Sequence, residues 1–259
     1  IEGIHFAINQ PDAATGIYAA QPHSFNNITI KDNAFSTTGS GAFTHPPSPF
    51  PVGRTQASAI TLLSTLSNHS ATITGNTVSV DLPADYAQTP YYGRAIWLYN
   101  IAATITGNTL DGALAADIVH QGAAGTNVIE DNQLLSTGLL LVSPASGTIT
   151  INNNTFDQAT MPAFDNPAFQ PLHAIAIRNN QNATITVDGN TFLNHQIGVW
   201  SGASQQVSVT NNTFTPAADR AGYDYSHILF DSGFQTTGTI PSSSSNSIAI
   251  QGNTFNGSD

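Results

Sequence analysis

The stretch Ile149–Phe156, which reads ITINNNTF, decides how this chain folds. It is a short β-branched run followed by an Asn, one further residue and a large apolar residue. A pattern that returns along a whole chain predicts a solenoid, in which one structural unit stacks on the next. The same pattern returns at Ile28–Phe35, Ala71–Val78, Thr104–Leu110, Val128–Leu134, Ile185–Phe192, Val207–Phe214 and Ile248–Phe255.

One Asn in each repeat serves as a marker. The number of residues between successive markers shows which repeats are bare coils and which carry an insertion. The intervals are 43, 32, 24, 22, 36, 22 and 41 residues, so we interpret 22 as one bare coil. Four insertions each follow the apolar end of a repeat, and this common position predicts long loops at one corner of the coil. They hold ten of the fourteen prolines, as expected for chain outside a β-ladder. The insertions are Ser36–Ser58, Ser79–Arg94, Asp157–His173 and Thr215–Ser226, and the markers are Asn33, Asn76, Asn108, Asn132, Asn154, Asn190, Asn212 and Asn253.

Each coil is expected to hold three short strands. Runs such as Ala95–Tyr99 and Ile197–Trp200 predict the first strand, and Thr184–Val187 and Val207–Val209 predict the second. No stretch has a capped 3.6-residue period, so we expect little helix. With a coil opened by Ile4–Ile8, about eight to nine coils make a rod ~40 Å long at the strand spacing of parallel sheets.

The marker Asn and the apolar residue after it are expected to stack from coil to coil. Asn tolerates the left-handed backbone of a tight turn, and its amide can bond the Asn above and below. Four aromatic residues are expected to form one inward ladder, namely Phe156, Phe192, Phe214 and Phe255.

This arrangement of strand, turn, Val-Thr-Ile-like run, Asn-Asn and Thr-Phe resembles the right-handed parallel β-helix, or pectate-lyase-like, superfamily over essentially the whole chain. The resemblance implies an all-β solenoid. It does not choose a function, because that superfamily includes polysaccharide lyases, polygalacturonases, uronan epimerases, phage tailspikes and surface adhesins. It also implies that glycan grooves border the outer face of the first strands, where the insertions fall.

Composition narrows the choice of partners. The net charge is −11, from five basic and sixteen acidic residues, which argues against nucleic acid and anionic membrane partners. There is no Cys and no apolar run near the ~18 residues of a membrane span. We expect residues 1–259 to form a single β-helix domain, a segment of a longer protein that is secreted or displayed at the cell surface.

The candidate ligand-binding residues combine aromatic rings with arginines, a mixture that suits a polysaccharide. We expect Trp97, Tyr99, Asp117, Arg178, Trp200 and Asp231 to point outward from the first strands, with Ile96, Leu98, Ile175, Ile177, Ile228 and Phe230 inward. Packing of the loops against these rings is the alternative interpretation. The predicted ligand-binding set is Arg94, Trp97, Tyr99, Arg178, Trp200, Tyr223, Tyr225 and Asp231.

Catalytic candidates are fewer. A lyase or epimerase needs a base and a cation, and Tyr99, Asp117, His120 and Arg178 are the residues that could supply them. Residues three apart on a strand face opposite ways, so Asp117 and His120 are not expected to act together unless His120 lies at the turn. His120 inside the core is the other interpretation.

Metal signals are also weak. Asp32, Asp131 and Asp188 precede turn residues on separated coils, so we predict no cofactor and no metal site, with calcium as the alternative. The leading hypothesis is therefore an adhesin-like, polysaccharide-binding β-helix module. A polysaccharide lyase or uronan epimerase acting on acidic glycans, and a structural stalk without ligand, remain as alternatives.

Overall fold

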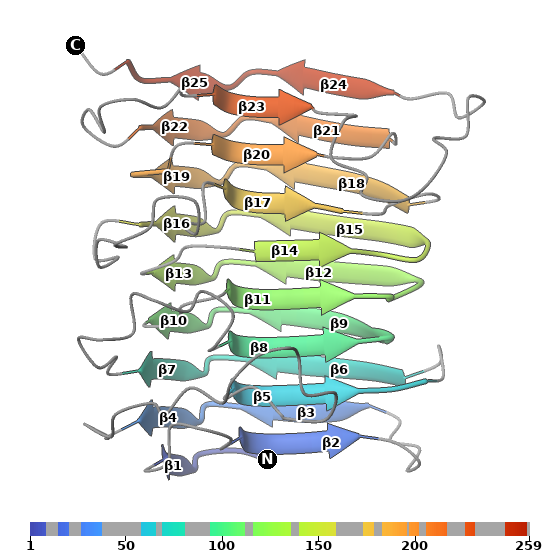
Figure 1. The fold of residues 1–259 in the computed structure, drawn as a ribbon, viewed down its shortest axis with the longest axis vertical. Helices are drawn as coiled ribbons and strands as arrows, with labels where there is room; N and C mark the ends of the chain where they lie inside the picture. Colours follow the sequence, from blue (N-terminus) through green and yellow to red (C-terminus); the bar gives the residue numbers. More distant parts are fainter. Residues whose placement is uncertain are drawn as a thin grey trace, which may run out of the picture.

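The computed structural model describes the strands and turns of a three-sided solenoid. The described residues are 1–8, 15–20, 27–37, 58–65, 69–80, 94–111, 116–135, 140–158, 173–178, 183–195, 197–201, 206–216, 226–230 and 247–257. Every regular element among them is a β-strand, and none of them forms a helix that could cross a membrane. The strands stack into three parallel sheets, as Figure 1 shows.

The first strands of the coils form the β2 sheet, which we name after its first strand. Its eight strands pair in parallel from one coil to the next. They are β2 (Thr15–Ala20), β5 (Ser58–Leu63), β8 (Arg94–Tyr99), β11 (Ala116–Gln121), β14 (Leu140–Ser143), β17 (His173–Ile177), β20 (Ile197–Ser201) and β23 (Ser226–Phe230).

The second strands form the β3 sheet, which also has eight strands. They are β3 (Ile28–Lys31), β6 (His69–Thr74), β9 (Ile101–Thr106), β12 (Thr126–Glu130), β15 (Gly147–Asn152), β18 (Ala183–Asp188), β21 (Gln206–Thr210) and β24 (Ile248–Gln251).

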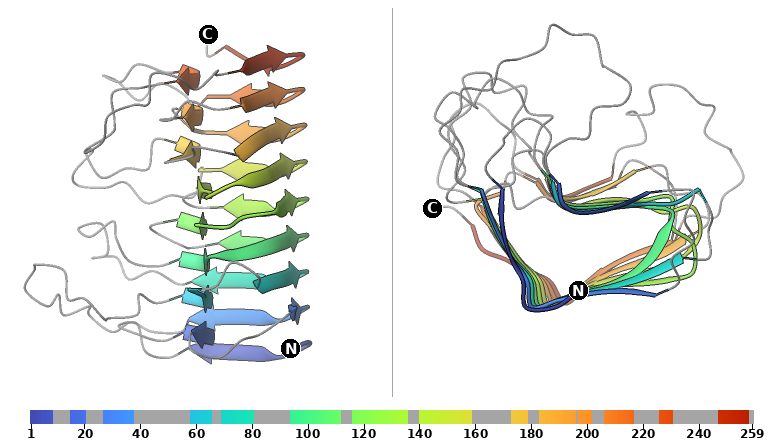
Figure 2. Two further views of the ribbon diagram at one scale, coloured as in Figure 1. Left: turned by 90° about the vertical axis from the view of Figure 1, so that its right-hand side faces the viewer. Right: turned by 90° about the horizontal axis from the view of Figure 1, so that it is seen from below.

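The third strands form the nine-stranded β1 sheet. They are β1 (His5–Ile8), β4 (Ala34–Thr37), β7 (Thr77–Val80), β10 (Thr109–Asp111), β13 (Gln133–Leu135), β16 (Thr155–Asp157), β19 (Thr191–Leu193), β22 (Thr213–Thr215) and β25 (Thr254–Phe255). The nine strands confirm the predicted coil number. Viewed along the rod, the three sheets surround one core (Figure 2).

The core is built from residues that alternate along each strand. On β18, Ile185 and Val187 are fully buried while Thr184 and Thr186 are not, as the alternation predicts. The aromatic ladder is confirmed: the ring centroids of Phe156, Phe192, Phe214 and Phe255 follow one another at 5.0, 4.6 and 5.2 Å in stacked geometry.

The marker asparagines form a second, polar ladder, which confirms the predicted bonding between them. The backbone N–H and the Nδ2 of each marker both donate to the Oδ1 of the next, at 2.8–3.0 Å. From Asn33 to Asn212 these side chains are buried. The ladder therefore satisfies buried polar groups by repetition alone.

The backbone conformation of the marker differs from the prediction. The left-handed residue is the one before the marker, for example Asp131 (φ 55°) before Asn132 and Gly189 (φ 64°) before Asn190. The marker itself is not among the left-handed residues, and its backbone N–H donates to the next Oδ1 along the rod.

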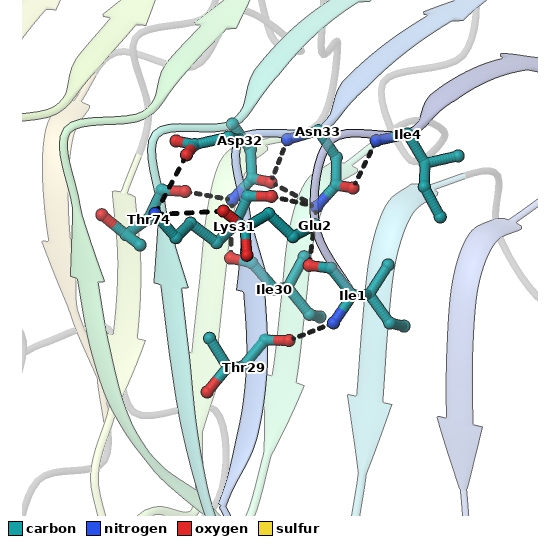
Figure 3. A network of polar contacts seen from close by, with 10 residues as sticks. Ile1, Glu2, Ile4, Thr29, Ile30, Lys31, Asp32, Asn33 and Thr74 are labelled. Atoms are coloured by element: carbon teal, nitrogen blue, oxygen red, sulfur yellow. Dashed lines mark hydrogen bonds and ion pairs between the residues drawn. The ribbon is translucent and has the colours of Figure 1, made fainter.

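At the N-terminal end, Ile4 occupies the position of a marker. Its backbone N–H donates to Asn33 Oδ1 at 3.1 Å, and Asn33 Nδ2 donates to the Ile1 carbonyl oxygen at 3.2 Å. Lys31 binds both Glu2 and Asp32 beside this turn, at 3.2 and 3.3 Å (Figure 3). The asparagine ladder therefore begins with an apolar residue, Ile4, in the place of a marker Asn.

The four predicted insertions lie between a third strand and the next first strand in chain order, and most of each lies outside the described residues. A further long interval, 231–246, separates β23 from β24, which is a different corner. The marker spacing did not reveal this further interval, because it cannot tell the corners of the coil apart.

Candidate functional site

The outer face of the β2 sheet carries an apolar strip that runs along the rod. Five register partners on neighbouring strands form it: Trp97, Val119, Leu141, Ala176 and Trp200. They make a hydrophobic cluster separate from the core, and we call them the outer strip. Apolar side chains packed along the outer face of a sheet require a covering or a ligand.

Most of the outer strip is shielded from solvent. Trp200 is 6% exposed and Val119 3%, whereas Trp97 is half-buried. Trp200 therefore points outward, as predicted, and its low exposure agrees with the alternative interpretation, in which the outward ring is packed against the protein. The strip forms a packed base, and the residues beside it are the ones within reach of a ligand.

Arg94 lies against the first tryptophan of the strip. Its Cζ is 4.3 Å from the centre of the Trp97 ring, a cation–π contact. Within the described part of the chain, the Nε and Nη1 atoms of Arg94 and the Nε1 of Trp97 are buried and have no hydrogen-bond partner. Burial lowers the pKa of Arg94 to about 10, so the side chain stays charged at neutral pH.

A second arginine lies over the other end of the strip. Arg178 Cζ is 5.9 Å from the Trp200 ring, and the ring of His173 packs against the same indole at 5.3 Å. Burial, helped by the charge of Arg178, lowers the pKa of His173 to about 4. His173 is therefore neutral at pH 7, and Arg178 is the charged, exposed group at this end.

Tyr99 and Arg178 stand in one column at the edge of the strip. Tyr99 pairs with Gln121 and Gln121 with Ser143, while Arg178 follows Ile177, the partner of Val142. Tyr99 is 44% exposed. Three strand steps separate the two residues, or ~14 Å along the rod, so only an extended ligand can contact both.

The interior of the coil holds the two strongest catalytic candidates. His120 is 1% exposed, lies in register with Leu98 and Val142, and its Nε2 donates to the Ile101 carbonyl oxygen at 3.0 Å. The His120 Nδ1 has no partner among the residues that the structure describes, and burial lowers the pKa of this histidine. His120 is therefore a core histidine. The sequence had left open whether it lies at the turn or inside the core.

Asp117 is also buried, at 0% exposure, and the prediction that it points outward is wrong. Its position matches Ala95, since Ile118 pairs with Ile96, and both Ala95 and Ile96 belong to the core. Two successive residues face inward at the start of these strands. The alternation that predicted an outward Asp117 begins one residue later.

Two small residues show what this extra inward position faces. A Cβ added at Gly16 would come within 2.7 Å of the Phe35 ring, and one added at Gly198 would overlap the Phe214 ring. Gly16, Ala59, Ala95 and Asp117 are equivalent through the pairing of the Ile that follows each of them. The position therefore lies against the third-strand ladder, far from any ligand on the outer face.

Three predicted ligand-binding residues, Tyr223, Tyr225 and Asp231, lie outside the described residues. Conversely, the prediction missed Val119, Leu141 and Ala176 as members of the outer strip. The unbroken apolar runs on their strands, for example Leu140–Val142, could have predicted these residues. A strand that is covered on both faces does not alternate between apolar and polar residues.

The described part of the chain holds no group of three His, Asp or Glu side chains that could bind a metal ion. Asp32 instead binds Lys31, and Asp188 accepts a hydrogen bond from Asn211 Nδ2 at 2.9 Å. Asp131 stands at a left-handed turn position, on a coil apart from both. These carboxylates do not converge.

Comparison with known proteins agrees with this geometry. The family described as the right-handed beta helix region matches residues 64–214, more than half of the chain. No curated protein and no solved structure matches the chain significantly.

Proposed function

On the premise that this chain belongs to the right-handed beta helix family, we propose that it is a polysaccharide-binding module of a secreted or surface-displayed, adhesin-like protein. Its ligand lies along the outer face of the β2 sheet. The observation that carries the proposal is the pair of Arg–Trp contacts, Arg94 with Trp97 and Arg178 with Trp200, at the two ends of one strip.

The chemistry of these residues suits a sugar polymer. Sugar rings present C–H faces, which pack on aromatic side chains, and hydroxyl groups, which accept hydrogen bonds from guanidinium and indole N–H groups. Arg94 Nε and Nη1 and Trp97 Nε1 are donors that the described residues leave without acceptors. The exposed groups beside them are the Tyr99 hydroxyl and the Arg178 guanidinium, which can hydrogen-bond the hydroxyl groups of a sugar at the surface.

The linear order of the site favours a polymer over a small molecule. Tyr99 and Arg178 are exposed in one column, and the strip beside them spans five neighbouring strands. A chain of sugars laid along the rod contacts several coils at once, and each contact adds to the affinity.

Binding is favoured over catalysis by the position of the acid–base candidates. A lyase or epimerase needs a base within hydrogen-bond reach of the substrate, but Asp117 and His120 lie inside the coil. Of the four catalytic candidates, Tyr99 and Arg178 remain on the outer face, and the described strands of the β2 sheet hold no carboxylate besides Asp117. The neutral His173 lies beside Trp200, three strand steps from Tyr99. The stalk hypothesis assigns no ligand to the two Arg–Trp contacts.

A glycan array tests the proposal directly. Wild type is expected to bind a defined set of polysaccharides, Trp97→Ala to lose that set, and Thr104→Ala, on the exposed face of the β3 sheet, to keep it. Thermal unfolding of each variant establishes that the coil is intact. If folded wild-type protein binds no glycan on the array, or if Trp97→Ala binds as wild type does, the proposal fails.

A further inference from the structure

The last described coil, made of β23, β24 and β25, leaves core residues open to solvent at one end of the rod. Ile248, Ile250 and Phe255 are 48%, 50% and 48% exposed. They continue core columns whose preceding members, on β21 and β22, are buried. The three strands are the last of their sheets (Figure 1), so each has one edge without a partner in the described part of the chain. We call this coil the open coil.

The open coil lacks the features that protect a terminal repeat. Solenoids need a polar outer face on their end repeats, and sheet edges are normally blunted by charged residues, prolines or bulges. β23, β24 and β25 contain no charged residue and no proline, although the chain has a net charge of −11. An apolar, uncharged edge of this kind is typical of a surface that binds another β-structure.

The asparagine ladder gives this end of the rod a chemical polarity. Each marker donates two hydrogen bonds to the Oδ1 of the next, and the last such step is from Asn212 to Asn253, at 2.9 and 3.0 Å. Asn253 is half-buried, and its Nδ2 also donates to the Val209 carbonyl oxygen at 2.8 Å. No described residue offers an Oδ1 beyond Asn253. The open coil therefore presents donors where a following marker asparagine would place an acceptor.

A second copy of this chain does not complement the open coil. At the other end of the rod Ile4 stands in the marker position, so it has no side-chain oxygen to offer Asn253. The ion pairs of Lys31 with Glu2 and Asp32 also lie beside that turn, whereas the open coil is uncharged. Two open coils that meet across a two-fold axis would oppose the donors of one Asn253 with those of the other. The complementary surface therefore belongs to a different chain.

We propose that the open coil is the docking surface for a coil of a partner β-helix, which adds one strand to each sheet and places an asparagine Oδ1 against Asn253. The partner coil carries apolar residues over Ile248 and Ile250. It also carries a large apolar residue over Phe255, whose ring already stacks on Phe214 at 5.2 Å. The bare coils of this chain have the same pattern, so the interface continues the stacking that joins them. This inference is independent of the ligand on the outer strip.

A one-coil peptide tests the inference by fluorescence anisotropy and hydrogen–deuterium exchange. The probe has the sequence of residues 197–216, a bare coil with its marker at Asn212, and the control peptide carries Asn212→Ala. We expect the probe to bind the full chain and to slow amide exchange in β24 and β25. The control should bind at least tenfold more weakly, because docking would bury the donors of Asn253 without an acceptor.

Two matched variants of the protein locate the docking surface. Ile250→Lys puts a charge on the open coil and should abolish binding of the probe. Ile4→Lys makes the same change at the opposite end of the rod and should leave binding unchanged. The two isoleucines are 50% and 46% exposed, so both variants are expected to fold, and thermal unfolding checks this.

Three results would overturn the inference. The first is that the probe does not bind, or that its binding is insensitive to Asn212→Ala or to Ile250→Lys. The second is that, without the probe, amides of β24 and β25 exchange as slowly as those of β21 and β22, because a segment of this chain would then cover the open coil. The third is the formation of end-to-end oligomers, measured by sedimentation velocity, that Ile4→Lys abolishes, because a second copy would then be the occupant.

Discussion

Replacing Asn154 by Ala removes one rung of the asparagine ladder in the middle of the rod. Its Nδ2 donates to the carbonyl oxygens of Ile129 and Asn152, each at 2.9 Å, and to Asn190 Oδ1 at 3.0 Å. Its Oδ1 accepts the backbone N–H and the Nδ2 of Asn132, at 3.0 and 2.9 Å. The truncation therefore breaks five side-chain hydrogen bonds at a site that is 1% exposed.

The expected loss follows from which of these groups find no other partner. Asn132 Nδ2 keeps its bonds to the Ile105 and Glu130 carbonyl oxygens, but the buried Asn132 backbone N–H loses its acceptor. One buried unsatisfied group costs about 1–3 kcal/mol, and each further net hydrogen bond is worth about 1 kcal/mol. We therefore expect Asn154→Ala to lower the free energy of unfolding by about 3–5 kcal/mol.

Urea denaturation measures this loss, and the neighbouring residue provides the control. Asn153 is exposed and left-handed (φ 53°), and Gly75, Gly107, Gly189 and Gly252 occupy the equivalent position on other coils. Asn153→Gly should change stability by less than about 0.5 kcal/mol. If Asn154→Ala is no less stable than Asn153→Gly, the ladder does not hold the turns in place and the reasoning is refuted.

Three further predictions concern single side chains. Arg94→Met should raise the melting temperature, because an unpaired buried charge is replaced by an apolar chain of similar length; a lower melting temperature would show that the guanidinium is structural. Stability should fall as the pH drops below about 6.5, the ordinary pKa of histidine, because unfolding frees His120 to take up a proton that burial resists. In His120→Leu, which matches Leu98 in the same column, urea titrations at pH 7 and pH 5 should show a smaller fall, and an unchanged fall would exclude His120 as a source. Gly16→Ala should cost about 1–3 kcal/mol by overlap with the Phe35 ring, 2.7 Å from the new Cβ; equal stability to wild type by calorimetry would show that the ring can move aside.

The fold was predictable because one set of contacts repeats. Each coil needs an Asn for the turn and a large apolar residue two positions later, so the pattern appears in the sequence as often as in the structure. The conformation of the turn was less accessible. Asn, Asp and Gly all occur just before the marker, and the backbone φ angles show that this preceding residue is the left-handed one.

The site was predictable only in part, because its residues do not repeat. Outward Trp97 and Tyr99 follow from strict alternation on β8, but Asp117 does not, since Ala95 and Ile96 both face the core. Sequence spacing gives no sign of two successive inward residues. The sequence also left open whether Trp200 is shielded, because the residues that shield a sheet face need not be close to it in sequence.

The tryptophans offer the most direct test of polysaccharide binding along the outer strip, because the chain has only two and both belong to it. A polysaccharide that binds in the glycan array is titrated into Trp97→Phe and Trp200→Phe proteins, so that the emission reports one end of the strip at a time. The account predicts saturable changes in the emission of both variants. Unchanged emission at both tryptophans, in folded protein that binds the ligand by calorimetry, would place the ligand elsewhere and contradict the account.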